Sequence, residues 1–405
     1  MSAHIDWNLL TETTMKTIRD LELKGKRVLI RVDFNVPMNE HGEITDDLRI
    51  RTILPTLHYA LEQGAKIILA SHCGRPKGKR VEKYSLAPIA KRLAELLGKD
   101  VKLSADCVGP EAEHDAAALH SGEVLLLENL RFYAGEESND PEFSKKLAAL
   151  ADVYINDAFA VSHRAHASVA GVTEHVTDKA AGLLLHKELD YFHRAIDTPQ
   201  RPLVAIVGGA KVSSKLQALN QMLDKVDKML IGGAMANTFL KSQGLAVGAS
   251  KVEDDLLDSA RQVLADAQAK GVKVYLPVDV IAADRFAPDA VCKQVTVQDI
   301  PDGWMALDIG PASVICFSEV LADAKTIVWN GPMGAFEMDA FARGTMALAH
   351  AVASAHALSI TGGGDSNAAM TQSGEAGNIS YMSTGGGAFL ELMEGKVLPG
   401  VAALE

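Results

Sequence analysis

Residues 203–215 read LVAIVGGAKVSSK, a run of five apolar residues that leads directly into two glycines and a polar turn. Leu216, Leu219 and Leu223 follow at the three- and four-residue spacing of a helix. A short, continuous apolar run before a glycine turn and a helix is typical of a buried parallel strand and the helix that covers it. This stretch therefore predicts one strand–turn–helix unit of an α/β fold.

The same rhythm recurs along the whole chain. The other expected strands cover residues 28–32, 66–70, 124–127 and 152–155 in the first half, and residues 228–231, 272–276, 326–329 and 358–360 in the second. Apolar strands that alternate with helices indicate parallel sheets covered on both faces. With 405 residues the chain exceeds one ordinary core. The sequence thus predicts an α/β protein with two doubly wound, Rossmann-like parallel-sheet domains.

The expected joint lies at residues 185–202. Residues 183–196 have apolar side chains at helical spacing, and the TPQRP stretch at residues 198–202 ends that pattern, because proline removes a backbone donor and disfavours helix before it. We interpret this segment as a helix that joins the domains; the alternative is a helix packed wholly inside one of them. We therefore expect residues 1–185 to form the first domain and residues 186–200 the connecting helix and hinge.

Composition limits the class of protein. Apolar residues make up 48% and charged residues 23% of the chain, as in soluble globular proteins. The formal net charge of −12 argues against nucleic acid or an anionic membrane as a partner. No apolar run approaches the ~18 residues of a membrane span, and the start MSAHIDWNLL is not a secretory signal. The four cysteines (Cys73, Cys107, Cys292 and Cys316) lack metal-ligand spacing, so we expect reduced thiols in a cytoplasmic protein.

Basic and amide side chains recur after the strands of the first half, where most of the arginines lie. The residues that follow the four strands are Asp33 and Asn35; Ser71, His72, Gly74 and Arg75; Glu128, Asn129 and Arg131; and Asn156, Asp157, His163, Arg164 and His166. A lone arginine is most often an ion-paired surface group, and a lone histidine is most often packed. Ligands of doubly wound sheets, however, bind beyond the carboxyl ends of the strands, and the planar fork of arginine matches carboxylate and phosphate. The recurrence predicts a site for a small polyanion.

Glycine turns after the strands of the second half predict a nucleotide site. Glycine lets backbone N–H groups approach phosphate, and a following helix N-terminus adds a favourable field. Besides residues 208–215, such turns occur at residues 231–234, 361–366 and 383–388, whereas GxxxxGK[ST] and GxGxxG are absent. Lys211 and Lys215 are four apart and would share a face on a helix. Asp365 could hold Mg²⁺ beside phosphate or cap a helix, and these two roles are compatible.

Several stretches together resemble the phosphoglycerate kinase family from about Met15 to the C-terminus. They are RVDFNVP at residues 31–37, SHCGRP at 71–76, ENLRF at 128–132, NDAF at 156–159, HRAH at 163–166, GGAK at 208–211, WNGP at 329–332, GGGD at 362–365 and VLPGV at 397–401. Departures from the family pattern are Cys73 in place of leucine, Val161-Ser162 in place of Gly-Thr, and Ala234 in place of glycine. None is a charged contact, so they concern local packing. Residues 1–14 fall outside the resemblance.

The resemblance implies a set of ligand-binding residues. For 3-phosphoglycerate or 1,3-bisphosphoglycerate they are Asp33, Asn35, Arg49, His72, Arg75, Arg131 and Arg164. For ATP or ADP they are Lys211, Lys215, Gly310, Asn330, Glu337, Gly363, Gly364, Asp365 and Ser366, with Glu337 near the ribose hydroxyls and Asp365 carrying Mg²⁺. The groups that act on the transferring phosphoryl would be Arg49, Lys211 and the N–H groups near Gly363 and Gly364.

The resemblance also implies a mechanism and an organisation. A phosphoryl group would pass directly from 1,3-bisphosphoglycerate to MgADP, and neither nucleophile needs a proton removed, so positioning and charge neutralisation suffice. His72 would then be a substrate contact. The second domain would cover residues 201–389, with residues 390–405 returning to the first, in a monomer whose hinge closes the domains around the substrates. The alternatives are an ATP-dependent carboxylate-activating ligase and a catalytically silent nucleotide-binding protein, the latter expected to lack Lys211 or Asp365.

Overall fold

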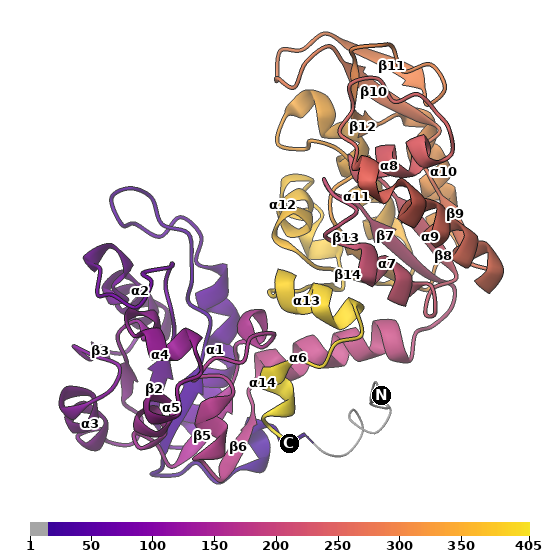
Figure 1. Ribbon diagram of the computed structural model, residues 1–405. Coiled ribbons are helices and arrows are strands. Elements are labelled where there is room, and N and C mark those ends of the chain that lie inside the picture. The colour runs from indigo at the N-terminus through magenta and orange to yellow at the C-terminus, as the bar shows by residue number, and fades with distance from the viewer. Residues whose placement is uncertain (1–14) are drawn as a thin grey trace. The chain divides into compact units, whose positions relative to one another are not determined.

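The computed structural model describes residues 15–405 and divides into two compact units (Figure 1). The first unit comprises the chain up to Asp190 together with Val397–Glu405, and the second comprises Tyr191–Lys396. What the sequence suggested for residues 1–14 lies outside the described residues. Within residues 15–405, no helix is both long and apolar enough to cross a membrane.

The first unit is built on one parallel sheet. Its strands, in the order β3-β4-β2-β1-β5-β6, are β3 (Val101–Leu103), β4 (Val124–Leu126), β2 (Lys66–Ala70), β1 (Arg27–Arg31), β5 (Val153–Asn156) and β6 (Asp178–Ala181). β1 pairs with β2 on one side and with β5 on the other. The strand order therefore reverses at β1, and a crevice for ligands is expected beyond the carboxyl ends of β1 and its neighbours.

Helices of the first unit begin and end where local chemistry dictates. They are α1 (Leu48–Glu62), α2 (Ala87–Leu97), α3 (Pro110–Ala117), α4 (Ala134–Glu137), α5 (Pro141–Ala148), α6 (Leu183–Phe192) and α14 (Pro399–Ala402), with short 3₁₀ turns at η2 (Ile18–Asp20), η3 (Glu82–Tyr84), η4 (Leu130–Phe132), η5 (Phe159–Val161) and η6 (Gly171–Glu174). Asp140 caps α5 by accepting from the N–H of Phe143, with proline at the first helical position. Gly98 ends α2 at a φ of 62°, where other residues would be strained.

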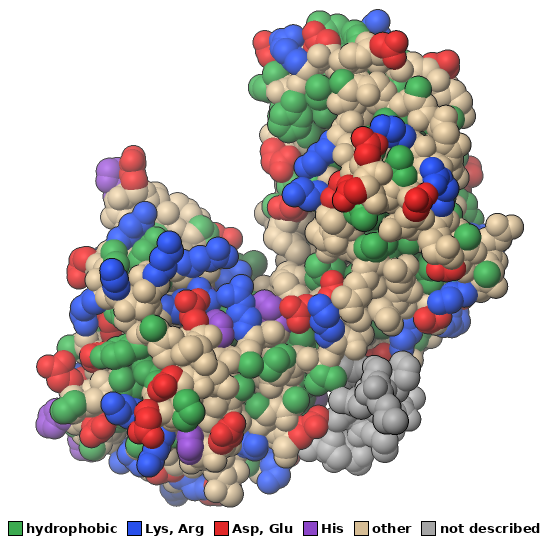
Figure 2. Space-filling model, in the orientation of Figure 1, with side chains coloured by type: hydrophobic (Ala, Val, Ile, Leu, Met, Phe, Trp, Pro, Cys, Tyr) green, Lys and Arg blue, Asp and Glu red, His purple; other side chains and the backbone are tan. Residues whose placement is uncertain are grey.

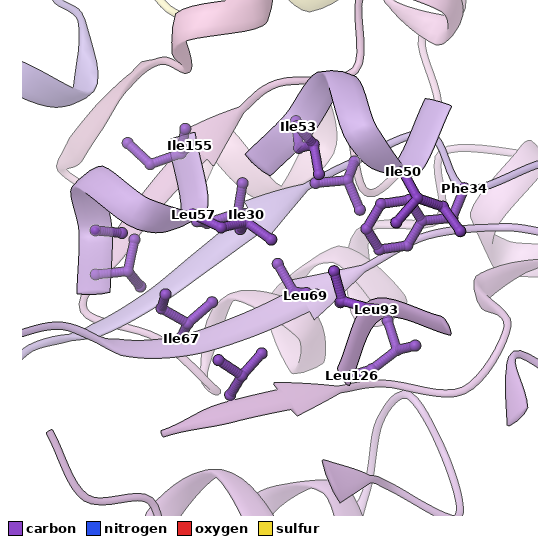
Figure 3. Close-up of a cluster of buried hydrophobic side chains, with 14 of the residues drawn as sticks. Ile30, Phe34, Ile50, Ile53, Leu57, Ile67, Leu69, Leu93, Leu126 and Ile155 are labelled. Carbon is purple, nitrogen blue, oxygen red and sulfur yellow. The ribbon is translucent and has the colours of Figure 1, made fainter. Parts of the chain in front are cut away.

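The core of the first unit fills the space between the sheet and two helices (Figure 3). Strand residues Ile30, Ile67, Leu69, Leu126 and Ile155 contact Ile50, Ile53 and Leu57 of α1 and Leu93 of α2, and all are buried. The alternate strand residues Leu29, Ile68 and Leu125 are equally buried, so the opposite face of the sheet is covered as well. This two-sided burial explains why the strands are continuous apolar runs.

The second unit repeats the plan around a second parallel sheet. Its strands, in the order β15-β14-β13-β7-β8-β9, are β15 (Tyr381–Met382), β14 (Leu358–Thr361), β13 (Thr326–Asn330), β7 (Leu203–Val207), β8 (Lys228–Ile231) and β9 (Lys273–Tyr275). The order reverses at β7, which pairs with β8 and β13. The prediction of two doubly wound parallel-sheet domains is confirmed.

The rest of the second unit consists of helices and a small antiparallel sheet that the sequence did not predict. This sheet has the order β11-β10-β12, with β10 (Asp279–Ala283), β11 (Cys292–Thr296) and β12 (Met305–Ile309). The helices are α7 (Leu216–Met222), α8 (Met235–Ser242), α9 (Leu257–Lys270), α10 (Pro311–Leu321), α11 (Arg343–Ser354), α12 (Gly364–Gln372) and α13 (Gly386–Met393), with short turns at η8 (Asp254–Leu256), η9 (Asp339–Phe341) and η10 (Ala376–Asn378).

The chain passes from the first unit to the second within one continuous helix. α6 begins beside the sheet of the first unit, where Asp157 accepts a hydrogen bond from the N–H of Leu185 at 2.9 Å. It continues as one π-helical turn, η7 (His193–Asp197), before the proline-containing segment. The chain returns to the first unit in α14, where the N–H of Gly400 donates to Ser162 O at 2.8 Å and Asn156 Nδ2 donates to Gly400 O at 2.9 Å (Figure 1, yellow).

Candidate active site

Basic side chains gather on one side of the first unit. Figure 2 shows Lys and Arg (blue), with His (purple) among them, along the upper side of this unit in the view. The residues predicted to bind a polyanion follow the carboxyl ends of β1, β2, β4 and β5, or, for Arg49, the start of α1. Because these ends meet at one edge of the sheet, the predicted residues share that edge.

The turn after β1 is organised by Asp33, Asn35 and Arg49. One carboxylate oxygen of Asp33 accepts from the N–H of Asn35 at 3.1 Å, and the other accepts from Arg49 NH1 at 2.7 Å. The same Arg49 nitrogen donates to Asn35 O at 3.1 Å. These contacts fix the guanidinium at the second position of α1, yet about a third of the Arg49 side chain, 37%, stays exposed. Arg49 can therefore still reach a ligand.

The turns after β2 and β4 are joined to this one through Gly74. Its N–H donates to Asn35 Oδ1 at 2.9 Å, and its carbonyl accepts from Arg131 NH1 at 2.9 Å. Gly74 has a φ of 62°, and a Cβ there would run into the ring of Tyr84, so only glycine fits. The strand ends of β1, β2 and β4 are thus linked in one hydrogen-bonded chain.

Arg131 is the most enclosed of the predicted arginines. It lies in η4, whose first turn Asn129 caps by accepting from the N–H of Arg131 at 3.0 Å. Only 4% of the residue is exposed, and Glu137 Oε1 lies 3.3 Å from its Nε. Burial lowers the pKa of Arg131 from its usual high value; Glu137 opposes this shift, and Arg31 and Arg164 add to it. A buried guanidinium beside a second one favours an anionic ligand.

Arg75 and Arg164 lie on the same edge with fewer contacts. Arg75 follows Gly74 directly and is exposed, and Arg164 is half-buried, with its Nε 3.2 Å from His163 Nε2. The structure therefore brings Asp33, Asn35, Arg49 and Arg131 into one hydrogen-bonded network, and His72 lies beside it, with Nδ1 3.8 Å from Asp33 Oδ1. It leaves Arg75 and Arg164 at the border of that network.

Sequence reasoning missed a charged layer beneath this surface. Arg31, the last residue of β1, is completely buried, and its Nε donates to Ser168 Oγ at 2.8 Å. Glu136 is also completely buried and accepts from the Ser168 N–H at 2.9 Å and from Ser168 Oγ at 2.6 Å. Arg31 NH2 lies 4.0 Å from Glu136 Oε1 and 3.2 Å from His72 Nδ1. The only local signal was Arg31 itself, an arginine directly after the apolar residues Val28–Ile30 of β1.

Lys215 is the central cation of the second unit. Its Nζ donates to Gly208 O at 2.6 Å and to Asn330 O at 2.9 Å, which joins the ends of β7 and β13. Burial lowers the pKa of Lys215 to about 8, and the carboxylate of Asp365 partly opposes this shift. The ammonium therefore lies at the point where the strand order of the second sheet reverses.

Lys211 and Lys215 do not share a helix face, so that sequence inference was wrong. α7 begins at Leu216, and residues 211–215 form a turn in which the N–H of Lys215 donates to Val212 O at 2.9 Å. Gly209, with a φ of 111°, reverses the direction of the chain, and the buried side chain of Val212 then packs into the core. These two features make residues 211–215 a turn instead of the start of the helix. Lys211 is consequently exposed to solvent.

The turn after β14 is held against the turn after β13. Asn330 Nδ2 donates to Gly362 O at 2.7 Å, and Ser366 Oγ accepts from the N–H of Gly331 at 2.7 Å. Gly363, with a φ of 101°, then leads into α12, whose first N–H groups have no acceptor within the helix and lie at this edge. Such N–H donors and the helix field suit phosphate oxygens.

Asp365 is exposed in the first turn of α12 and interacts electrostatically with Lys215. Residues 15–405 contain no group of three or more His, Cys, Asp or Glu side chains that could enclose a metal ion. Mg²⁺ suits such a place, because it keeps several waters and binds one carboxylate together with ligand phosphates. The residues present therefore fit Mg²⁺ that arrives with a nucleotide.

Gly310 and Glu337 lie elsewhere on the second unit. Gly310 precedes α10, whose N-terminus is already capped by Asp279, since that carboxylate accepts from the N–H groups of Ala312 at 3.1 Å and Ser313 at 2.7 Å. A Cβ on Gly310 would run into Asp279, so the glycine is needed for space rather than as a free helix end. Glu337 is exposed in the segment after β13.

Comparisons with known proteins agree along almost the whole chain. The family profile described as Phosphoglycerate kinase matches residues 18–396. A phosphoglycerate kinase of Desulfotalea psychrophila is 69% identical over 391 residues, covering 96% of this chain and 100% of its own, and one of Geobacter metallireducens is 60% identical over 383 residues, covering 95% and 96%.

Solved structures give the same result. A phosphoglycerate kinase from Coxiella burnetii superposes with a TM-score of 0.88 at 44% identity, covering 96% of this chain and 99% of its own. One from Pyrococcus horikoshii superposes with a TM-score of 0.83 at 33% identity, covering 96% and 98%.

Proposed function

Because the chain belongs to the phosphoglycerate kinase family, we propose how its two sites divide the reaction of that family. The chain is a phosphotransferase with a carboxyl group as acceptor: it moves a phosphoryl group reversibly from 1,3-bisphosphoglycerate to ADP, giving 3-phosphoglycerate and ATP. Neither a ligase with a second acceptor nor a silent binding protein is needed to explain it. In our proposal, each of the two units binds one of the two substrates.

The first unit binds the phosphoglycerate. The single observation that supports this best is the hydrogen-bonded chain Arg49–Asp33–Asn35–Gly74–Arg131, which sets two guanidinium groups on one surface. A phosphoglycerate carries a carboxylate or acyl phosphate at one end and a phosphate at the other, and forked guanidinium groups match both. His72 belongs to the same surface, and Arg75 and Arg164 at its border complete the set.

The second unit binds ATP or ADP. The N–H groups near Gly363, Gly364 and Ser366 and the ammonium of Lys215 suit the phosphates. Asn330 fixes the turn that presents them. Gly310 and Glu337 lie on the segments that would meet the nucleoside, with Glu337 placed for the ribose hydroxyls. Mg²⁺, held by Asp365 and the phosphates, supplies neutralisation of the phosphate charge when bound.

Transfer itself needs orientation rather than proton removal. The attacking oxygen is an ionised phosphate of ADP in one direction and an ionised carboxylate in the other, so no general base is required. Arg49 and Lys211, with the N–H groups of Gly363 and Gly364, stabilise the charge on the migrating phosphoryl group. Lys211 is exposed and can turn toward a ligand, whereas Arg49 is held by Asp33 and keeps 37% of its side chain exposed for contact with one.

The reaction also requires the two ligands to meet in the absence of water. Since each ligand is held by its own unit, we propose that residues 186–200 act as a hinge about which the substrate domain and the nucleotide domain close. Small-angle scattering tests this: either ligand alone is expected to compact the enzyme partly, and both together fully. Equal compaction with nucleotide alone would contradict a closure that depends on both ligands.

The assignment is tested by a coupled assay with 3-phosphoglycerate and MgATP. We expect acyl phosphate to form without any second acceptor, and Asp365→Ala to weaken the dependence of the rate on Mg²⁺. If the rate of Asp365→Ala depends on the Mg²⁺ concentration as the wild-type rate does, Asp365 does not bind Mg²⁺. We further propose that the enzyme acts in the cytoplasm as a monomer, with no nucleic acid or membrane partner.

A further inference from the structure

The buried charge beneath the first site lies against His72. Arg31 is completely buried, and its three nitrogens are all engaged: Nε with Ser168 Oγ, NH1 with Val32 O and NH2 with His72 Nδ1. His72 is itself only 3% exposed. The contact between Arg31 and His72 is therefore enclosed by protein on nearly every side.

The chemistry of a guanidinium group determines which nitrogen of His72 carries the proton. Arginine has only N–H donors and no acceptor. The Arg31 NH2 group, 3.2 Å from His72 Nδ1, can be satisfied only if Nδ1 offers its lone pair. A proton on Nδ1 would set two donors against each other. The remaining proton of a neutral imidazole is then on Nε2.

The electrostatic surroundings keep the ring neutral. Arg31 from β1, Arg49 from α1, Arg131 from η4 and His166 from the segment after η5 all disfavour an added positive charge on His72. Asp33 Oδ1 lies 3.8 Å from His72 Nδ1, beyond hydrogen-bond distance, and it already accepts from a backbone N–H. Burial and the three arginines hold the pKa of His72 well below its usual value of 6.5.

The carboxylate of Glu136 offsets the cost of burying the charge of Arg31, and it does so without forming a hydrogen bond to His72. Its carboxylate is satisfied by the backbone and hydroxyl of Ser168, and it lies 4.0 Å from Arg31 NH2. An isolated buried guanidinium would be strongly unfavourable, so this compensation is what allows Arg31 to stay charged at the end of an apolar strand.

We propose that Arg31 is a positioning residue that holds His72 as the neutral tautomer with its proton on Nε2, so that His72 serves the site as a fixed hydrogen-bond donor. The acceptor is an anionic oxygen of the bound phosphoglycerate, and this part of the inference rests on the proposed function. His72 then acts neither as a cation nor as a base, because its one free lone pair is occupied by Arg31.

The first test concerns the tautomer alone and needs no activity. Long-range ¹H–¹⁵N spectra of the full-length enzyme labelled with ¹⁵N-histidine distinguish the two neutral tautomers and the imidazolium, and a His72→Gln sample identifies the His72 signals. We expect a protonated Nε2, an unprotonated Nδ1 and no titration between about pH 5.5 and 8. A signal from a proton on Nδ1, or a ring that titrates near pH 6.5, would overturn the proposal.

The second test removes the positioning group while keeping the buried charge balanced. In Arg31→Met/Glu136→Gln both charges are lost together, whereas the control Glu136→Gln retains the Arg31–His72 contact. We expect Nδ1 of His72 in the double variant to take up a proton at a higher pH than in the wild type, because the opposing guanidinium is gone, and the KM for 3-phosphoglycerate to rise about 10-fold, with kcat changed less. The control should keep the wild-type tautomer.

A purely structural role for Arg31 predicts a different result. It would lower the thermal midpoint of the double variant but leave the pH at which His72 Nδ1 gains a proton as in the wild type, and that outcome would refute the proposal. The KM of the double variant is divided by that of the wild type at each pH from 5.5 to 8, because the ionisation of the substrate affects both values equally. This ratio should be lower at low pH, where His72 of the variant is protonated and can again donate from Nε2. If this KM ratio does not change with pH although the protonation of His72 does, His72 does not contact the substrate, and the proposed hydrogen bond from His72 to phosphoglycerate is wrong. The proposed function is tested separately, by the coupled assay.

Discussion

The two proposed ligand sites of this enzyme are assembled in different ways. In the first unit, the functional side chains bind one another: Arg49 pairs with Asp33, and Arg131 is held by Gly74 and Glu137. In the second unit, glycine turns and backbone carbonyls form the site, while Lys211 and Asp365 are exposed in solvent. One site is ordered before its ligand arrives, and the other presents a rigid backbone with side chains that the ligand must order.

This difference agrees with the chemistry of the ligands that we propose for the two sites. A small polyanion offers little surface beyond its charged groups, so its site has to hold several cations near one another, and their repulsion must be offset by carboxylates such as Asp33 and Glu137. A nucleotide brings its own metal and a chain of phosphates. Backbone N–H groups at a helix start suit that chain without concentrating positive charge.

The largest expected effects come from removal of Arg49 or Lys211. The two variants should lose activity equally but differ in the stability of the fold. Arg49→Ala and Lys211→Ala are each expected to cost about 2.7–4 kcal/mol of transition-state stabilisation, the range for removal of one preorganised donor. Arg49→Ala should also destabilise the fold, because Asp33 loses its partner, whereas Lys211→Ala should shift stability by less than about 0.5 kcal/mol. Steady-state kinetics and urea denaturation measure the two quantities.

Arg51→Ala is the matched control for Arg49→Ala. Arg51 lies two residues further along α1 and pairs with Asp47 at 2.7 Å on the solvent side. Its loss removes an exposed ion pair worth at most ~1 kcal/mol and should leave turnover close to that of the wild type. Turnover of Arg49→Ala that matched Arg51→Ala would show that Arg49 takes no part in transfer.

The next effect concerns the backbone of the second site. A Cβ on Gly208 would run into the carbonyl oxygen of Pro332, which is backbone and cannot move aside easily. Gly208→Ala should therefore destabilise the enzyme by about 1–3 kcal/mol, as overpacking does, and weaken ADP binding. The control is Gly377→Ala, where a Cβ meets nothing within 4 Å. Denaturation curves that coincide for the two variants would mean that the turn after β7 adapts freely.

The sequence predicted the parts of the molecule that local patterns encode. Most strands of the two parallel sheets were found because burial on both faces makes them continuous apolar runs. The edge strands β3, β6 and β15 were not predicted, because they are short and only partly buried. The ligand-binding edge was found because polar residues follow those runs. The antiparallel sheet was missed because β11 (Cys292–Thr296) is mostly exposed and has no apolar run, so nothing indicated a partner for the apolar strand β10 (Asp279–Ala283).

Long-range pairing explains the remaining failures. Arg31 is buried because Glu136 and Ser168, more than a hundred residues away, satisfy it, and no local pattern announces such a contact. The spacing of Lys211 and Lys215 suggested a shared helix face, but the helix starts later, because Val212 is drawn into the core after a glycine turn. In both cases contacts with residues distant in the sequence, or burial in the core, determined the local structure, and the local sequence pattern did not.

The smallest expected effect is a difference in pH dependence between the two sites. Burial lowers the pKa of Lys215 to about 8 in the free enzyme, and bound phosphates favour the charged ammonium and raise it. Binding of ADP must then take up a proton above pH 8, so its affinity should fall by up to about tenfold for each pH unit above that value. Binding of 3-phosphoglycerate relies on guanidinium groups, which stay charged, and on a histidine whose ring is neutral throughout, so it should stay level from pH 8 to about 9.5.

Isothermal titration calorimetry in two buffers of different ionisation enthalpy measures both the affinity and the proton uptake. Lys215→Met provides the comparison, since it should bind ADP more weakly at pH 7.5 and lose the dependence on pH, while its affinity for 3-phosphoglycerate stays that of the wild type. If ADP binding by the wild type takes up no proton at pH 9, Lys215 is not next to the phosphates. If the affinity for 3-phosphoglycerate falls with rising pH as the affinity for ADP does, the two sites do not differ in their electrostatics. The contrast between a site of paired side chains and a site of backbone groups and a lysine would then be wrong.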